Sequence, residues 1–463
     1  MRKTLFLLLL LLSACASLLP PPAAPRINPA LTVRTHPDGP LYVGDLVSFE
    51  VYNPLAAQPT SDLLRISLAG KTLAEQAFSQ FGMGARSQAT FFWVWDTHGL
   101  QPGDYIFSFT LLPASISWDQ KISLLPGAQL PSAEVGAHWS SVETNCCTLH
   151  YITGTDAEKD LDALKSMLDA QAVDVERRMG RQYTGKVPVT YLPRTLGHGG
   201  FTSDGIYVSY LHQNYAGGTA QQVTHHELVH WLDGQMGGDL RPSMLQEGLA
   251  VYMSDGHFKV EPILPRAAAL IDLNLYIPLR KLADTFYFSQ HEASYAEAAA
   301  LISYLLSTYG RDAFNHFYRD IKPAKSGSQA DALDAALQAH FGIRLETLEA
   351  NFTAFLRQQP VDGSARTDMR LTVAFYDTVR RYQREMDPSA YFLYTWLPSV
   401  SDMRQRGIVA DFLRHPDGLL NQQIESLLVA GDVALRAADY NSLESKINTV
   451  NLLLDLRDRF GGQ

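Results

Sequence analysis

Residues Thr219–Gly256 read TAQQVTHHELVHWLDGQMGGDLRPSMLQEGLAVYMSDG, and the rest of the chain is best understood outward from this stretch. His226 and His230 are four positions apart, so on a helix both imidazoles lie on one face, one turn from each other. Apolar residues at helical spacing, with Gly234 at the expected end, indicate that a helix forms here. The stretch therefore predicts two histidines that can reach one metal ion. The alternative is that they are polar residues aligned by chance.

A second helix is predicted from RPSMLQEGLAVY, with Ser243 as its N-cap and Gln246 completing a capping box. Glu247 then lies early in this helix, 17 positions after His230 (247 − 230), which lets the chain reverse and keeps both helices adjacent. Two imidazoles and one carboxylate leave Zn²⁺ an open fourth position, whereas structural zinc more often uses four ligands rich in cysteine. The neighbouring Glu227 is placed to take a proton from water whose pKa zinc lowers toward about 7.

The segments HELVH and QEGLAVY resemble the gluzincin zinc metallopeptidases, specifically the peptidase MA-like group, over roughly Gly136–Gln359. The resemblance implies that His226, His230 and Glu247 bind one Zn²⁺ per chain and that Glu227 is the general base. It also implies hydrolysis of peptide bonds in a peptide or protein substrate.

The resemblance extends less fully to other residues around the expected site. In similar aminopeptidases a tyrosine stabilises the oxyanion; the matching segment SYAEAAALISYLL makes Tyr295 the candidate, although Ala298 stands where those enzymes have glycine. Tyr295 could instead simply pack at the start of a helix. Asp255 is expected to orient a ligand histidine, and the strand 205–210 is expected to be an exposed edge that lines the cleft. Nothing in GHGGFTSDGIYVSYL matches the GxMEN segment by which aminopeptidases hold a free amine, so nothing argues for an aminopeptidase.

The first residues indicate export. Residues 1–15 combine a basic start with a short apolar run and end in LSAC, which resembles the lipobox of bacterial lipoproteins. The resemblance implies a lipid on Cys15, followed by a Pro/Ala-rich tether over residues 16–27. We therefore expect a protein of the cell envelope, extracytoplasmic and lipid-anchored to a bacterial membrane. The alternative is an ordinary secretory signal with an incidental cysteine.

Three regions are expected after the tether. Short strands rich in β-branched and aromatic residues predict an all-β, immunoglobulin-like sandwich over residues 28–127. Residues 136–360 predict an α+β catalytic domain of gluzincin type, in which a capping box at Thr155–Glu158 opens a helix that stops at Gly180. The segment PVDGSA is expected to be a linker, and residues 366–463 a helical region that packs or binds a partner.

The amino-acid composition limits the classes of function that the chain can have. A net charge of −10 without a basic patch argues against nucleic acid as a partner, and 46% hydrophobic with 19% charged residues fits a globular protein. Cys146 and Cys147 are adjacent, which makes a poor metal site; they are either a buried and a half-exposed thiol or a vicinal disulfide. Two functions remain: a surface-anchored zinc metallopeptidase, or a lipoprotein scaffold whose peptidase-like domain has little activity. The presence of Glu227 favours the peptidase.

Overall fold

The computed structural model describes residues 31–53, 62–194, 199–257, 259–394, 396, 399–416 and 418–460. The chain divides into two compact units. One comprises residues 1–81 and 86–129, and the other comprises residues 82–85 and 130–463. Among the described residues, none of the helices combines the length and the hydropathy needed to cross a bilayer. The expected signal peptide and Cys15 lie outside the described residues.

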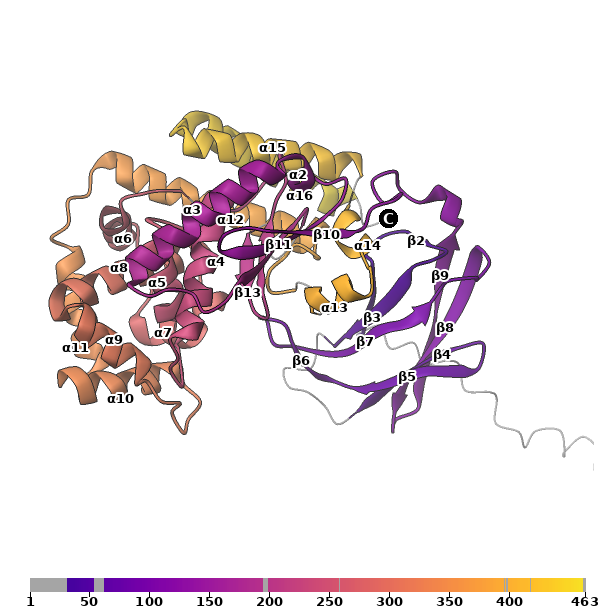
Figure 1. Ribbon diagram of the computed structural model, residues 1–463, viewed down its shortest axis with the longest axis horizontal. Coiled ribbons are helices and arrows are strands. Elements are labelled where there is room, and N and C mark those ends of the chain that lie inside the picture. The colour runs from indigo at the N-terminus through magenta and orange to yellow at the C-terminus, as the bar shows by residue number, and fades with distance from the viewer. Residues whose placement is uncertain are drawn as a thin grey trace, which may run out of the picture. The chain divides into compact units, whose positions relative to one another are not determined.

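The first unit is a β-sandwich of two sheets (Figure 1). One sheet has the order β1-β3-β7-β6 and the other the order β2-β9-β8-β4-β5. The strands are β1 Thr32–His36, β2 Leu41–Tyr42, β3 Leu46–Tyr52, β4 Leu63–Leu68, β5 Lys71–Ala77, β6 Ser79–Phe81, β7 Arg86–Asp96, β8 Gly103–Leu112 and β9 Ile116–Leu125. Phe49 of β3 packs on Phe107 of the other sheet with ring centroids 5.1 Å apart, so alternate residues of both sheets build one core.

The second unit begins with a five-stranded sheet of order β10-β11-β12-β14-β13. Its strands are β10 Trp139–Glu143, β11 Cys147–Ile152, β12 Val187–Leu192, β13 Gly200–Thr202 and β14 Ile206–Ser209. The three central strands are parallel, while β10 and β13 pair antiparallel at the two edges. The strand 205–210 was expected at the edge; the structure instead places β13 there, because the chain turns back after Thr202 and β14 pairs with both β12 and β13.

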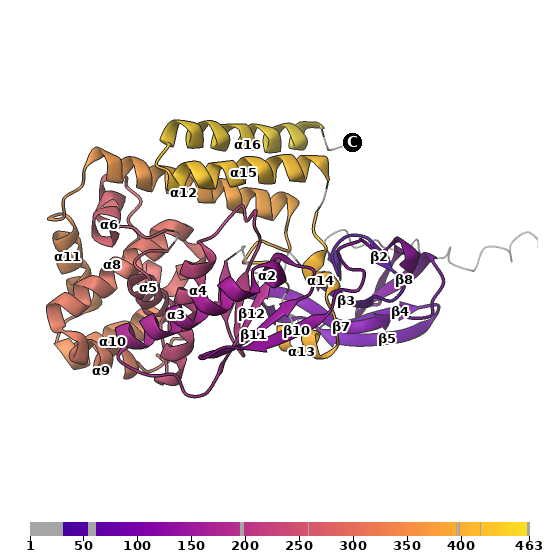
Figure 2. The same ribbon diagram turned by 45° about the horizontal axis from the view of Figure 1, so that its top comes forward.

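Helices make up most of the rest of the second unit (Figure 2). Those before the C-terminal region are α2 Asp156–Lys159, α3 Leu161–Met179, α4 Ala220–Gln235, α5 Ser243–Met253, α6 Ile263–Asp272, α7 Leu279–Thr285, α8 His291–Tyr309, α9 Arg311–Arg319, α10 Gln329–Phe341 and α11 Leu345–Leu356. One hydrophobic core joins the sheet to these helices and surrounds α4 and α5. The predicted order of sandwich, α+β domain and C-terminal helices is confirmed.

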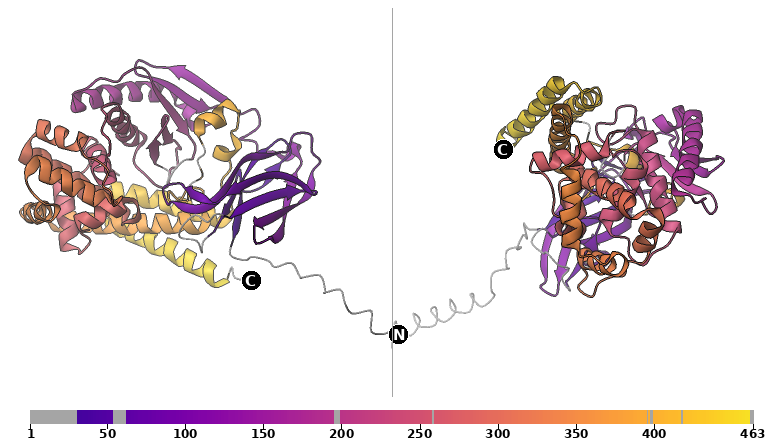
Figure 3. Two further views of the ribbon diagram at one scale, coloured as in Figure 1. Left: turned by 90° about the horizontal axis from the view of Figure 1, so that it is seen from below. Right: turned by 90° about the vertical axis from the view of Figure 1, so that its left-hand side faces the viewer.

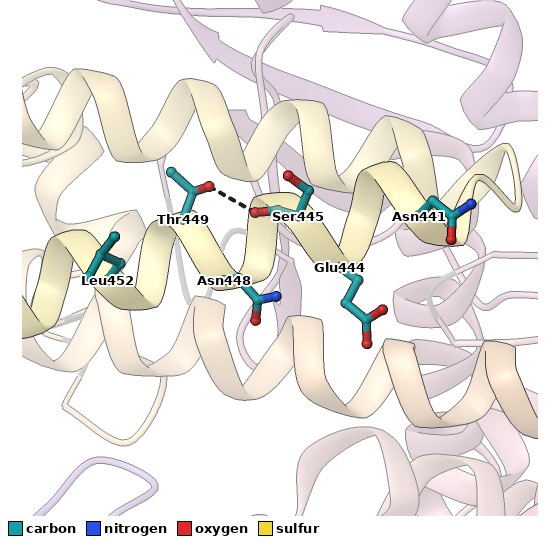
Figure 4. Close-up of a pocket in the computed structure, with 6 residues that line it drawn as sticks. All are labelled: Asn441, Glu444, Ser445, Asn448, Thr449 and Leu452. Carbon is teal, nitrogen blue, oxygen red and sulfur yellow. Dashed lines mark hydrogen bonds between the residues drawn. The ribbon is translucent and has the colours of Figure 1, made fainter.

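The C-terminal helices are α12 Gly363–Met386, α13 Val400–Gln405, α14 Ala410–Leu413, α15 Leu419–Arg436 and α16 Tyr440–Phe460. The long helices α12, α15 and α16 lie side by side around their own apolar core (Figures 2 and 3). The outer face of α16 is mainly polar; Glu444, Asn448 and Thr449 point away from the helix axis (Figure 4). The expected linker PVDGSA is wrong at its end, because the Asp362 side chain accepts a hydrogen bond from Ala365 N at 2.7 Å and starts α12.

Two predicted helix starts also need correction. The helix expected after Thr155 is broken at Asp160 into α2 and α3, and the Thr155 hydroxyl donates to Ile152 O instead of capping. Ser243 is the first residue of α5 and not its cap: Pro242 precedes the helix, and the free Ser243 N–H donates to Gln329 Oε1 at 2.8 Å. The end at Gly180, which adopts a left-handed conformation, agrees with the prediction.

The two adjacent cysteines, for which the sequence left two possibilities, form a disulfide between Cys146 and Cys147 at the start of β11. Cys147 is buried in the core of the second unit, and Cys146 N donates to Asp169 Oδ1 of α3 at 3.0 Å.

Candidate metal centre and active site

Helix α4 carries both histidines into the interior of the second unit. Its first turn is capped by Thr219, whose hydroxyl accepts a hydrogen bond from Gln222 N. His226 and His230 are both buried, and their rings lie 4.6 Å apart between centroids. The four-residue spacing thus places the two imidazoles one above the other on the same helix face, as predicted.

Helix α5 supplies the carboxylate because it approaches α8 very closely. A Cβ added at Gly248 would lie 2.5 Å from Ala298 O, so only glycine allows this crossing. Glu247, the residue before this contact, is buried and directed at the two histidines.

The three side chains converge on one point. Nε2 of His226 and Nε2 of His230 are 2.9 Å apart, and each is 3.2 Å from Glu247 Oε2. A tetrahedral ion with ligand bonds of about 2.0–2.1 Å separates its ligand atoms by roughly 3.3 Å, which is close to these three distances. Neutral imidazole has only one N–H, so two Nε2 atoms facing each other and a carboxylate suit a shared cation. The residues present therefore fit zinc.

Burial makes this group of charges costly without a cation. Burial lowers the pKa of His226 to about 4. For His230 burial acts in the same direction, but the attraction of Glu247 outweighs it and raises the pKa to about 9. Burial would raise the pKa of Glu247, yet the two histidines hold it well below its usual range. Without a metal ion, then, a proton on His230 balances Glu247, and a metal would replace that proton.

Glu227 lies beside the triad and is held from β13. The Thr202 hydroxyl donates to Glu227 Oε2 at 2.8 Å and contacts Glu227 O at 3.1 Å. β13 reaches α4 because Gly200 has no side chain: a Cβ there would be 2.8 Å from Val223 Cγ1 and 3.0 Å from Glu227 Cγ. Burial raises the pKa of Glu227 to about 7, a value suited to a general base near neutral pH.

Besides Thr202, a second residue of the site was not predicted from the sequence. Tyr287, in the short 3-10 helix Phe286–Phe288, donates its hydroxyl to Glu247 Oε1 at 2.6 Å. Oε1 is thereby occupied, so Oε2 is the oxygen directed at the histidines. Forty positions separate Tyr287 from Glu247, and no motif or periodicity in the segment TFYFS signals the contact.

Tyr295 lies close to the triad, in the second turn of α8. Its ring centroid is 6.4 Å from that of His226, and it stacks on His257 at 3.8 Å with an angle of 6° between the planes. Burial raises the pKa of Tyr295 well above its usual range, so its hydroxyl keeps its proton and is a donor. Its role as the oxyanion donor stays a prediction.

Asp255 does not reach a ligand histidine. Its carboxylate accepts from Arg178 Nη2 at 2.6 Å and its side chain is half exposed, because a left-handed turn after α5 directs it outward. His225, on a different face of α4, bonds to Ser254 Oγ and Asp174 Oδ2 and thus ties α4 to its neighbours. His198, in the segment before β13, lies outside the described residues.

Comparison with known families agrees with this geometry. Residues 189–358, from β12 to the end of α11, match the family described as the Peptidase MA superfamily. The second unit thus contains a region that is similar to the Peptidase MA superfamily. The match includes α4 and α5 with the three converging residues, so the resemblance noted for the two sequence segments is confirmed.

Among solved structures, the chain is similar to a mutant of an M1 zinc metallopeptidase from Deinococcus radiodurans. The identity is 14%, the coverage is 72% of this chain and 95% of the other, and the TM-score is 0.33. It is also similar to an aminopeptidase N family protein from Idiomarina loihiensis, with 9% identity, coverage of 72% and 77%, and a TM-score of 0.31. No curated protein matches the chain.

Proposed function

We propose that this chain is a surface-anchored, zinc-dependent metallopeptidase. His226, His230 and Glu247 would hold one Zn²⁺ per chain, and Glu227 would act as the general base. The observation that carries the proposal is the triad itself: three buried ligand atoms, 2.9–3.2 Å apart, with a buried carboxylate beside them. A scaffold without activity would need neither Glu227 nor the Thr202 hydroxyl that fixes it.

Each residue of the site has a distinct proposed role in peptide hydrolysis. Zinc, when bound, supplies a Lewis acid and lowers the pKa of water toward about 7. Thr202 holds Oε2 of Glu227, which leaves Oε1 to accept a proton from the attacking water and pass it to the leaving amine. Tyr295, whose hydroxyl stays protonated, is the proposed donor to the developing oxyanion. The edge strand β13, beside α4, offers its free side to an extended peptide backbone.

The anchor is a separate part of the proposal. The lipobox-like LSAC supports acylation of Cys15, which would place the peptidase outside the cytoplasm on a bacterial membrane. Mass spectrometry of the N-terminal peptide from the native host tests this directly. A mature chain that begins with acylated Cys15 is expected; an unmodified chain cleaved elsewhere would contradict it.

Activity is best tested with zinc-loaded protein that lacks residues 1–15, incubated with a broad peptide library. Cleavage is expected in the wild type and should be lost in Glu227→Gln, which keeps the shape but cannot take a proton. Glu346→Gln, on an exposed side chain, is the matched control and should cleave normally. Zinc-loaded wild type that cleaves nothing in the library would favour the scaffold alternative.

A further inference from the structure

The C-terminal region, which the sequence predicted to pack or to bind a partner, comes near the metal triad through Arg380 of α12. Arg380 Nη2 lies 3.2 Å from Nε2 of His291, the first residue of α8. The ring of His291 is 5.2 Å from that of His257, which in turn is 5.9 Å from the ring of His226. Two side chains, His291 and His257, thus lie in contact between Arg380 and His226 of the triad.

Among the described residues, the hydrogen-bond partners of the Arg380 guanidinium are all neutral. Nη1 donates to the Gln383 amide oxygen at 2.7 Å, and Nη2 donates to His291 Nε2, since arginine cannot accept. The guanidinium carbon lies 4.8 Å from the ring centroid of Phe392. Nε is buried and has no hydrogen-bond partner within the described parts of the chain. Five N–H donors therefore face very few acceptors.

Three other arginines with little exposure in the described part of the same unit are paired with carboxylates. Arg266 bonds to Glu261 and Asp368, and Arg414 forms a two-point contact with Glu134 at 2.8 Å. Arg194 pairs with Asp387. For Arg380, the described residues offer no carboxylate within 4.0 Å. A cation that is largely buried without an anion is unfavourable, and burial accordingly lowers the pKa of Arg380.

The carboxylate of Glu292, whose charge acts on the Arg380 guanidinium, is already used by two histidines. Its Oε1 accepts from His257 Nδ1 at 3.1 Å and from His291 Nδ1 at 2.9 Å. These three groups could be read as a second metal site. Arg380 argues against that reading, because it places a positive charge against His291 and fixes the His291 proton on Nδ1, where it is donated to Glu292. The cluster instead holds Arg380 in place from one side.

We propose that Arg380 binds a carboxylate of the peptide substrate, which supplies the anion that the protein itself does not. This inference rests on the peptidase function proposed above. A guanidinium binds a carboxylate through two parallel N–H donors, which gives both affinity and orientation. Because two side chains, His291 and His257, lie between Arg380 and His226, this carboxylate would not belong to the residues joined by the bond that is cleaved. It would be either the C-terminal carboxylate or an Asp or Glu side chain.

Binding is measured by calorimetry on zinc-loaded Glu227→Gln protein, so that turnover plays no part. The probes are N-acetyl-pentaalanine with a free C-terminal carboxylate, its C-terminal amide, and amides in which one alanine is replaced by Glu. The free acid or one of the Glu peptides should bind about 10–100-fold more tightly than the plain amide. Which of the two binds distinguishes a C-terminal carboxylate from an acidic side chain.

Substitution then assigns the preference to Arg380. Arg380→Gln should abolish the difference between the anionic and neutral peptides, and Arg380→Lys should restore part of it, because the charge returns without the two-point geometry. Arg384→Gln, one turn further along α12 and half exposed, is the matched control and should keep the preference. Circular dichroism and zinc content confirm that the variants are folded and loaded.

The results separate the two proposals. Equal affinity for all peptides, or an equal loss for anionic and neutral peptides in Arg380→Gln, would overturn the recognition role and leave Arg380 as a packing residue. A preference that depends on Arg380 supports recognition even if the wild type cleaves no peptide, in which case the peptidase function alone fails. Cleavage of peptides without any preference for anionic ones would support the peptidase function and overturn the recognition role of Arg380.

Discussion

Two clusters in the second unit each consist of two histidines and one glutamate, yet the hydrogen bonds within them are arranged differently. In the triad of His226, His230 and Glu247, two Nε2 atoms face each other at 2.9 Å. In the cluster of His257, His291 and Glu292, both Nδ1 atoms donate to one carboxylate oxygen, and Arg380 occupies the far nitrogen of His291.

The difference shows that donor types alone do not define a metal site. The second cluster satisfies its hydrogen bonds with the protons that neutral or charged imidazoles carry, whereas the triad brings acceptors together and needs a cation to hold them. Burial increases the difference between the two clusters, because an unpaired charge raises the free energy of the folded state when it is removed from water. We therefore expect zinc at the triad and none at the second cluster, and the following variants test that contrast.

The largest effect is expected from a matched pair of glutamate substitutions. Glu247→Gln removes a charged ligand and should reduce bound zinc from about one ion per chain to little or none after dialysis. Glu292→Gln should keep the full zinc content, because it alters only hydrogen bonds to His257 and His291. Elemental analysis of both variants measures the zinc bound per chain. Equal loss of zinc in the two variants would contradict the proposed difference between the clusters.

The next largest effect concerns catalysis without metal loss. Glu227→Gln should lower kcat/KM by about 10²–10⁴-fold, because the general base is lost. Zinc content should stay at the wild-type value, since Glu227 bonds to Thr202 and not to the ion. Kinetics on a cleaved library peptide, together with metal analysis of the same preparation, measure both quantities. Retained activity would remove Glu227 from the mechanism.

A smaller effect is expected where a residue acts through a ligand. Tyr287→Phe removes the donor to Glu247 Oε1 and should weaken zinc binding by about 10–100-fold while the protein stays folded. Competition with a chelator of known affinity gives the dissociation constant. Tyr309→Phe, whose ring stacks on Phe341 in another part of the unit, is the control and should bind zinc normally. Unchanged affinity in Tyr287→Phe would show that this contact does not support the site.

The smallest effect concerns the pH dependence of stability at the second cluster. Burial, followed by the charge of Arg380, lowers the pKa of His291 from 6.5 to about 4. Between these values the unfolded chain binds more protons, so this histidine stabilises the fold above pH 6.5 and loses that contribution as pH falls to 4. His291→Gln should flatten the free energy of unfolding across this window by roughly 1–3 kcal/mol. Urea denaturation of zinc-free protein measures it; an unchanged slope would exclude His291 as a source.

Much of the fold and of the metal triad could be predicted from the sequence, because these features depend on residues that are close together in the chain. The spacing of His226 and His230 fixes a shared helix face, and the apolar pattern around Glu247 fixes the second helix. Strand-rich and helix-rich segments likewise gave the order of the regions. The start of α5 was predicted wrongly because a serine before an apolar run looks like a cap whether or not a proline precedes it.

What the sequence did not reveal depends on distant partners. Thr202, Tyr287 and Arg380 contact Glu227, Glu247 and His291 across 25, 40 and 89 positions, from a strand, a 3-10 helix and the C-terminal region. No periodicity links such pairs, and each residue type is ordinary in its own segment. Asp255 shows the converse, because it is near α5 in sequence but turned toward Arg178 by the backbone.

The most direct test of the central contrast is diffraction from crystals of the zinc-loaded protein at wavelengths on both sides of the zinc absorption edge. We predict one anomalous peak between His226 Nε2, His230 Nε2 and Glu247 Oε2, and none among His257, His291 and Glu292. A peak at the second cluster, or none at the triad in zinc-saturated crystals, would contradict the account.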